Sequence, residues 1–179
     1  MVRVNLDGSG EGSISTGVGF FDHMLEQLAK HGLLDLEVRA TGDLNVDAHH
    51  TVEDVGICLG EAIKQALGKK EGIVRFASST VPMDEALVLT SIDISGRGSL
   101  GLDLDVRQEM IGGFPSHLVG EFFKALTNNA GITVHIRKLS GDNPHHTIEA
   151  AFKSFAHSLQ EAVSLSDRVK GTPSTKGTL

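Results

Sequence analysis

The feature that most constrains this chain is a short motif that it contains twice. The sequence His-His-Thr-Val-Glu at 49–53 returns as His-His-Thr-Ile-Glu at 145–149, 96 residues later. If each copy opens a helix, the two histidines lie four and three residues before the glutamate, so all three side chains can converge on one point. Imidazole and carboxylate ligands suit a borderline divalent cation. The motif therefore predicts a metal site built twice; the other interpretation is a duplicated helix start whose acid stabilises the first turn.

The repeat extends beyond the motif, because each half reads strand, strand, helix, strand, helix. In the first half we expect strands at 2–6, 12–16 and 34–38, and helices at 20–30 and from 49 to 68. After an extended stretch at 73–76 and a break at 81–85, the second half predicts a hairpin of 87–94 with 100–106, a helix at 117–128, a strand at 131–136 and a helix from 145 to 163. This pattern indicates an internally duplicated α+β fold, with half-domains at 1–80 and 81–168 and a tail at 169–179 that composition alone would call disordered.

Composition excludes several classes of protein. The net charge is −7 and no basic run stands out, which argues against nucleic acid or an anionic membrane as the main partner. No apolar segment approaches the ~18 residues of a membrane span, and the N-terminus lacks the long apolar region of a signal peptide, so we expect a cytoplasmic protein. With no Trp or Tyr, the 8 Phe must fill the core together with aliphatic residues. The single cysteine, Cys58, lies in an apolar run and is expected to be a buried structural thiol.

Two further residues extend the proposed metal sites. His23 and Glu121 lie on the helices that precede the two motifs, at places that correspond within one residue through the repeat. Each half could thus offer four ligands, namely His23, His49, His50 and Glu53 in the first and Glu121, His145, His146 and Glu149 in the second. So many ligands indicate two metals, and a mixed nitrogen and oxygen set favours octahedral Mn, Fe or Co over closed tetrahedral Zn.

A few basic residues could bind an anion. Arg97 lies in Ser-Gly-Arg-Gly, where missing side chains let a ligand approach, and Lys176 lies in Pro-Ser-Thr-Lys-Gly, which offers hydroxyls, backbone N–H groups and a charge. Taken alone, Arg75 reads as a surface residue. Lys153 lies four residues after Glu149, the spacing of an ordinary helix salt bridge.

The motifs together resemble the imidazoleglycerol-phosphate dehydratase family. The resemblance rests on residues 47–54 and 141–153, and is supported by 17–25, 82–85 and 173–177. It implies the removal of water from imidazole glycerol phosphate to give imidazole acetol phosphate in histidine biosynthesis. It also implies two Mn²⁺ ions holding the substrate imidazole, a duplicated half-domain of the ribosomal protein S5 domain 2-like type, and trimers that assemble into a 24-subunit shell with active sites at subunit contacts.

The resemblance also implies a role for each matching residue. His50, Glu53, His146 and Glu149 would be catalytic as well as metal ligands, and the substrate would contact Gln27, Arg75, Arg97, Lys153, Ser174, Thr175 and Lys176. Asp84 and His31 would support them. Two departures stand out: Glu121 replaces a histidine common in relatives, and relatives usually begin with a basic strand, bearing a substrate-contacting Glu, that would precede Met1. A dinuclear metal phosphohydrolase and a metal-storing shell protein are the alternative functions.

Overall fold

The computed structural model describes all residues 1–179 as a mixed α+β fold with four helices and three sheets. The helices are α1 (Gly19–Gly32), α2 (His49–Leu67), α3 (Leu118–Ala130) and α4 (Pro144–Val163). The strands are β1 (Val2–Asn5), β2 (Gly12–Ser15), β3 (Asp35–Arg39), β4 (Phe76–Met83), β5 (Ala86–Asp93), β6 (Ser99–Asp103), β7 (Met110–Ile111), β8 (Phe114–Pro115) and β9 (Thr133–Ser140). Both His-His pairs open a helix, as the motif predicts.

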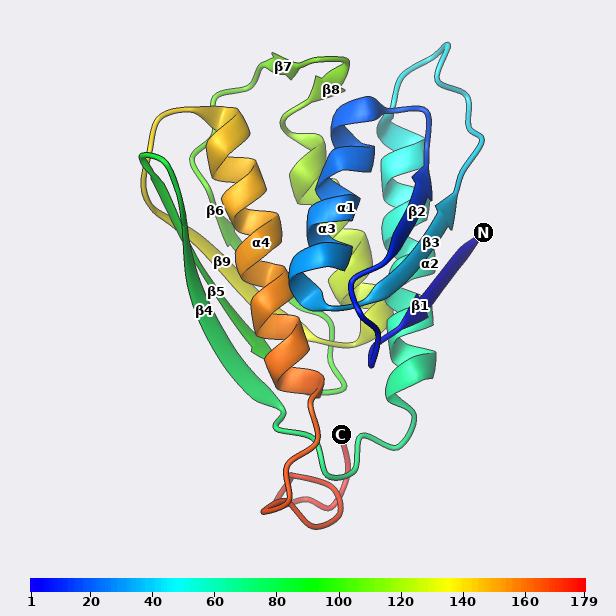
Figure 1. Cartoon of the computed structure of the whole chain (residues 1–179), viewed down its shortest axis with the longest axis vertical. Helices are drawn as coiled ribbons and strands as arrows, with labels where there is room; N and C mark the ends of the chain where they lie inside the picture. The colour runs from blue at the N-terminus through cyan, green and yellow to red at the C-terminus, as the bar shows by residue number, and fades with distance from the viewer.

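The internal duplication is visible in the strand pairing (Figure 1). In the first sheet, β3 lies between an antiparallel β1 and a parallel β2; in the second, β9 lies between an antiparallel β5 and a parallel β6. Helices α1 and α2 contact the first sheet, α3 and α4 contact the second, and the two layers meet where α1 packs on α4 and α2 on α3. The duplicated α+β fold is therefore confirmed.

The predicted hairpin of 87–94 with 100–106 is wrong. Strand β9 lies between β5 and β6, so these two neighbours in the chain do not pair. Instead β5 pairs along its full length with β4, which runs into the predicted break at 81–85 as far as Met83 and turns at Asp84, a residue with φ of 48°. Pro82 is tolerated because β4 is an edge strand, where a missing N–H donor costs no ladder bond. Strand β4 crosses residue 80, and the half-domain boundary placed there stays a prediction.

The core is built as the composition predicts, from phenylalanine and aliphatic side chains. Phe21, Phe122, Phe123, Phe152 and Phe155 are all fully buried, and their rings pack across α1, α3 and α4 with centroid separations of 4.9–5.3 Å for the closest pairs. None of the four helices is both long and apolar enough to cross a membrane.

Two expectations from composition are corrected by the structure. Cys58 is exposed and lines an open cavity between β1 and α2, whereas the corresponding Ser154 on α4 is buried and bonds to Thr90 on β5. The tail folds back on the body of the protein: the N–H of Gly72 donates to the carbonyl of Gly171, and Arg75 donates to the carbonyl of Pro173 at 2.6 Å.

Candidate metal centre and phosphate pocket

Three predicted ligands converge where α1 packs on α4. Nε2 of His23 and Nε2 of His145 both lie 3.2 Å from the same oxygen, Oε2 of Glu149, and the three ligand atoms lie within 4.8 Å of one another. The ring of Phe20 packs edge-on against His145, with 5.0 Å between centroids, and limits its rotation. We call His23, His145 and Glu149 the histidine cluster. It is the only group of three or more such side chains this close in the chain.

Glu149 is held in its charged form although it is buried. Its side chain is 7% exposed, and Nζ of Lys153 lies 2.7 Å from Oε1. Burial on its own raises the pKa of Glu149, but the hydrogen bond and charge of Lys153, together with His23, outweigh it and bring the pKa below its ordinary value. An ionised carboxylate beside two imidazole nitrogens is a donor set that fits a divalent cation.

A series of side-chain contacts along α1 holds the other ring nitrogen of His23. Nδ1 of His23 lies 3.5 Å from Nε2 of Gln27, whose Oε1 lies 3.2 Å from Nε2 of His31. Burial, followed by the nearby charge of Lys153, lowers the pKa of His31 below its ordinary value. The i, i+4 spacing along α1 thus links the predicted substrate residue Gln27 and the predicted supporting residue His31 to His23. The same spacing along α4 brings Lys153 to Glu149.

The first copy of the motif is more open. Nε2 of His49 lies 3.8 Å from Oε2 of Glu53, and both side chains are more than 40% exposed. Glu121 corresponds to His23, because each lies ten residues before the left-handed C-cap residue of its helix, Gly131 and Leu33 respectively. The carboxylate of Glu121, however, lies 3.9 Å from Nζ of Lys124. The expected grouping by halves is wrong for His23, because α1 packs on α4 and so joins the motif of the other half.

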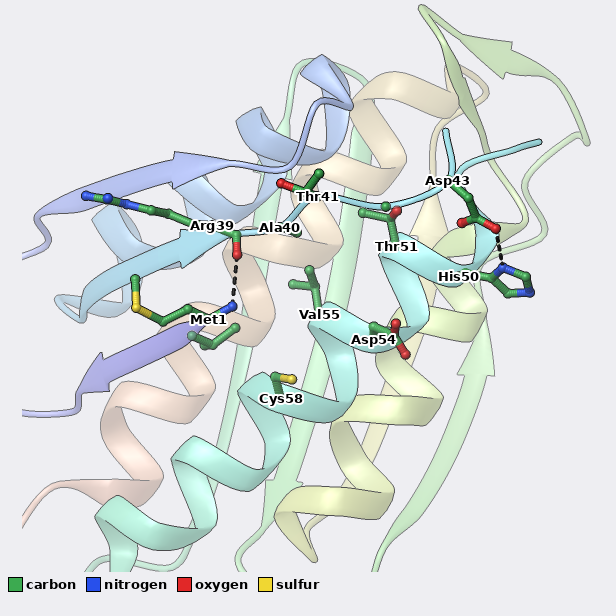
Figure 2. Close-up of a pocket in the computed structure, with 12 residues that line it drawn as sticks. Met1, Arg39, Ala40, Thr41, Asp43, His50, Thr51, Asp54, Val55 and Cys58 are labelled. Atoms are coloured by element: carbon green, nitrogen blue, oxygen red, sulfur yellow. Dashed lines mark hydrogen bonds and ion pairs between the residues drawn. The ribbon is translucent and has the colours of Figure 1, made fainter. Parts of the chain in front are cut away.

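The second histidine of each motif has a carboxylate partner that the sequence did not single out. Nδ1 of His50 lies 3.1 Å from Oδ2 of Asp43 (Figure 2), and Nδ1 of His146 lies 2.8 Å from Oε2 of Glu85. The hydrogen bond to Asp43 raises the pKa of His50, and the bond to Glu85 raises the pKa of His146. In return, the His146 bond is the main cause that lowers the pKa of Glu85 to about 2. Asp84, a predicted supporting residue, lies 3.7 Å from Nε2 of His146.

His50 and Asp43 also line the rim of a cavity of about 280 Å³ between β1 and α2. Thr51, Asp54 and Cys58 face the same cavity from successive turns of α2 (Figure 2). The hydroxyl of Thr51 is the one buried side-chain polar atom in the chain without a hydrogen-bond partner.

The predicted anion-binding residues meet at the other end of the molecule. Arg75, Arg97, Ser174, Thr175 and Lys176 all line one polar pocket of about 460 Å³. Asp93 fixes the Arg75 guanidinium through a 2.8 Å bond from Nε. The residues that line the pocket include three basic side chains and no acidic one. The sequence could not show this grouping directly, because the tail approaches the sheet only after the chain has folded.

The histidine cluster, at the start of α4, and this polar pocket, the candidate phosphate pocket, lie far apart in one chain (Figure 1). His145 begins α4, whereas the N–H of Arg75 donates to the carbonyl of Ala162 near the end of this 20-residue helix. A rise of about 1.5 Å per residue separates the two sites by roughly 25 Å. No small molecule can contact both within a single chain.

Comparison with known proteins gives consistent results. A family model described as imidazoleglycerol-phosphate dehydratase matches residues 16–159. The imidazoleglycerol-phosphate dehydratase of Acetivibrio thermocellus is 59% identical over 178 residues, covering 99% of this chain and 91% of the relative. That of Desulforamulus reducens is 58% identical over 179 residues, covering 100% and 91%.

Solved structures agree with these relatives. The crystal structure of imidazoleglycerol-phosphate dehydratase from Staphylococcus aureus superposes with a TM-score of 0.86 at 38% identity, covering 92% of this chain and 93% of that one. The enzyme from Pyrococcus furiosus gives a TM-score of 0.85 at 39% identity, covering 100% and 94%.

Proposed function

This chain belongs to the imidazoleglycerol-phosphate dehydratase family of hydro-lyases, and we propose that it dehydrates imidazole glycerol phosphate to imidazole acetol phosphate at dinuclear metal sites shared between subunits. The observation that carries this proposal is the pairing of an imidazole-and-carboxylate cluster with a separate cationic pocket. The first suits a metal-bound imidazole ring and the second suits a phosphate. The substrate named for the relatives has both groups.

Each motif would contribute to holding one of two divalent cations, with Mn²⁺ as the proposed metal. In the histidine cluster, His23, His145 and Glu149 are already within reach of one ion, and His146 begins the same helix turn. The proposed ligands of the other ion are His49, His50, Glu53 and Glu121. Bound cations would supply Lewis-acid stabilisation of the negative charge that develops on the substrate imidazole.

The remaining residues would bind and orient the substrate. Arg75, Arg97 and Lys176 would neutralise the phosphate, and the hydroxyls of Ser174 and Thr175 would donate hydrogen bonds to it. Lys153 keeps Glu149 ionised, so that this carboxylate stays available as a ligand rather than holding a proton. Gln27 lies against His23 and would meet the substrate at the edge of the cluster.

The distance between the two sites requires more than one subunit. About five single bonds of roughly 1.5 Å join the ring of imidazole glycerol phosphate to its phosphorus, a reach below about 8 Å. The histidine cluster and the phosphate pocket of one chain are roughly 25 Å apart along α4. We therefore propose that the ring binds at the cluster of one subunit while a neighbour supplies the phosphate pocket, in trimers that assemble into the 24-subunit shell.

Complementation between inactive variants tests the shared site. His145→Ala removes a metal ligand and Lys176→Ala removes a phosphate contact, so each variant alone should lose dehydration. When the two are co-expressed with different tags and purified through both, about one quarter of the sites should combine two intact contributions, because subunits assort at random in a symmetric oligomer. A co-assembled oligomer without recovered activity would show that each site lies within one subunit.

Product analysis tests the reaction class. A dehydratase leaves the phosphate on an enolisable ketone, whereas a dinuclear phosphohydrolase releases inorganic phosphate. We expect keto product without phosphate release, and loss of turnover after exhaustive chelation with recovery on adding Mn²⁺. Turnover that survives removal of all metal would exclude the proposed mechanism.

A further inference from the structure

The second histidine of each motif makes the same contact with the same ring atom. Asp43 meets Nδ1 of His50 at 3.1 Å, and Glu85 meets Nδ1 of His146 at 2.8 Å. Figure 2 shows the Asp43 side chain reaching down from the link that precedes α2 toward the His50 ring. In both pairs the contact engages Nδ1 and leaves Nε2 free of this bond.

The two carboxylates come from elements that the duplication does not relate. Asp43 lies in the link between β3 and α2, while Glu85 lies in the turn between β4 and β5. The link in the second half, between β9 and α4, supplies no carboxylate to His146 in the structure. Two unrelated elements therefore reach the same atom of corresponding histidines. Duplication of one ancestral contact does not explain why both histidines have a carboxylate at Nδ1. A shared need to fix both imidazole rings does explain it.

Glu85 is itself fixed in place. Its second oxygen, Oε1, accepts a hydrogen bond of 3.0 Å from the N–H of Asn143. The side chain of Asn143 in turn accepts from the N–H groups of His145 and His146, which caps α4. Glu85 thus ties the β4–β5 turn to both the start of α4 and the ring of its second histidine.

This geometry has a consequence for ligation. A histidine that donates its Nδ1–H to a carboxylate is held in the tautomer whose Nε2 lone pair can bind a metal, and the carboxylate makes that nitrogen more basic. Without such a partner the ring can rotate and exchange tautomers. Metal binding then has to immobilise the ring, and the lost conformational entropy weakens the affinity for the metal.

We infer that Asp43 and Glu85 are positioning residues that fix the imidazoles of His50 and His146 with Nε2 directed to the two metal ions. The inference rests on the proposed function, since it assumes that both histidines are ligands. Neither carboxylate contacts the metal or the substrate in this arrangement. Glu85 has the larger role, because its contact with the ring is shorter and its second oxygen is anchored.

The test is the affinity of the metal-free full-length protein for Mn²⁺ alone, measured by competition with a fluorescent chelator. Glu85→Ala and Asp43→Ala should each weaken binding about 10- to 100-fold at the affected site, the usual effect of removing an outer partner of a ligand. Glu85→Gln keeps the shape and an acceptor oxygen but loses the charge, so it should weaken binding less than Glu85→Ala. Asp103→Asn is the matched control, because Asp103 pairs with Arg137 on the exposed edge of the second sheet, and it should leave the affinity unchanged.

A second measurement separates positioning from general loss of structure. Nitrogen NMR of the histidine rings in Zn²⁺-loaded protein should show protonated Nδ1 at His146 in the wild type and a changed signal in Glu85→Ala, while the metal-free variant still unfolds cooperatively on heating. Variants that bind Mn²⁺ like the wild type would overturn the inference while leaving the proposed function intact. A wild-type protein that binds no Mn²⁺ would instead overturn the proposed function.

Discussion

The two copies of the His-His motif are nearly identical in sequence and different in structure. In the second copy, Glu149 is 7% exposed and lies 3.2 Å from both His145 and His23. In the first, Glu53 is 45% exposed and lies 3.8 Å from His49, with no third ligand in reach. The second copy is a preformed cluster, and the first is an open surface.

The reason for this difference lies outside the motif. Four residues after Glu149 stands Lys153, whose charge allows the carboxylate to be buried in its ionised form. Four residues after Glu53 stands Ile57, which offers no such charge. The residue at the place of His23 is Glu121, which adds a second negative charge where the other half has an imidazole. The spacing within the motif therefore does not by itself preorganise the three side chains; the residues that pack around the glutamate do.

The largest effect should come from removing the charge that supports the buried glutamate. Lys153→Met leaves Glu149 ionised without its closest partner and should lower the free energy of unfolding of the metal-free protein by about 2 to 3 kcal/mol at pH 8. The control is Lys124→Met, which removes the exposed partner of Glu121 and should cost less than about 0.5 kcal/mol. Equal effects in urea unfolding would contradict the contrast between the two halves.

A smaller effect is expected where α2 and α3 approach closely. A Cβ at Gly60 would lie 2.5 Å from the backbone oxygen of Leu126, so Gly60→Ala should force the helices apart and cost about 2 kcal/mol despite the better helix propensity of alanine. The corresponding residue of α4 is Ala156, which is already buried without such a clash. Ala156→Gly should cost about 1 kcal/mol through propensity. A Gly60→Ala protein as stable as the wild type in urea would show that α2 and α3 can shift freely.

The smallest effect concerns the exposed carboxylate partners in the metal-free protein. The pKa values of His50 and His146 are raised by Asp43 and Glu85. Each pair therefore adds stability that is fully present below the unfolded pKa of about 6.5 and fades as pH rises through the folded pKa. Asp43→Asn should lower the pKa of His50 alone, and Glu85→Gln that of His146 alone, in proton NMR titrations. If both rings shift in either variant, the two pairs are not independent.

The sequence was sufficient for the parts of this protein that are local or repeated. Helical spacing placed the four helices, Gly32 and Gly68 marked the ends of the first two, and the doubled motif indicated both the duplication and the likeness of His23 to Glu121. Arg97 and the tail residues that line the polar pocket were singled out as candidates because small residues around a cationic side chain are recognisable along the chain. These signals depend on neighbours within a few positions.

Tertiary structure alone decided which of these pieces meet. Strand β9 enters between β5 and β6, α1 packs on α4 rather than α2, and Glu85 reaches His146 across 61 residues of chain. Such contacts depend on burial of whole helix and sheet faces, which a local pattern does not encode. The doubled motif therefore specified which residues could bind a metal, and the sequence already placed Lys153 one turn after Glu149. Only the packing of α1 on α4 brought His23 to that glutamate, which left one copy assembled and the other open.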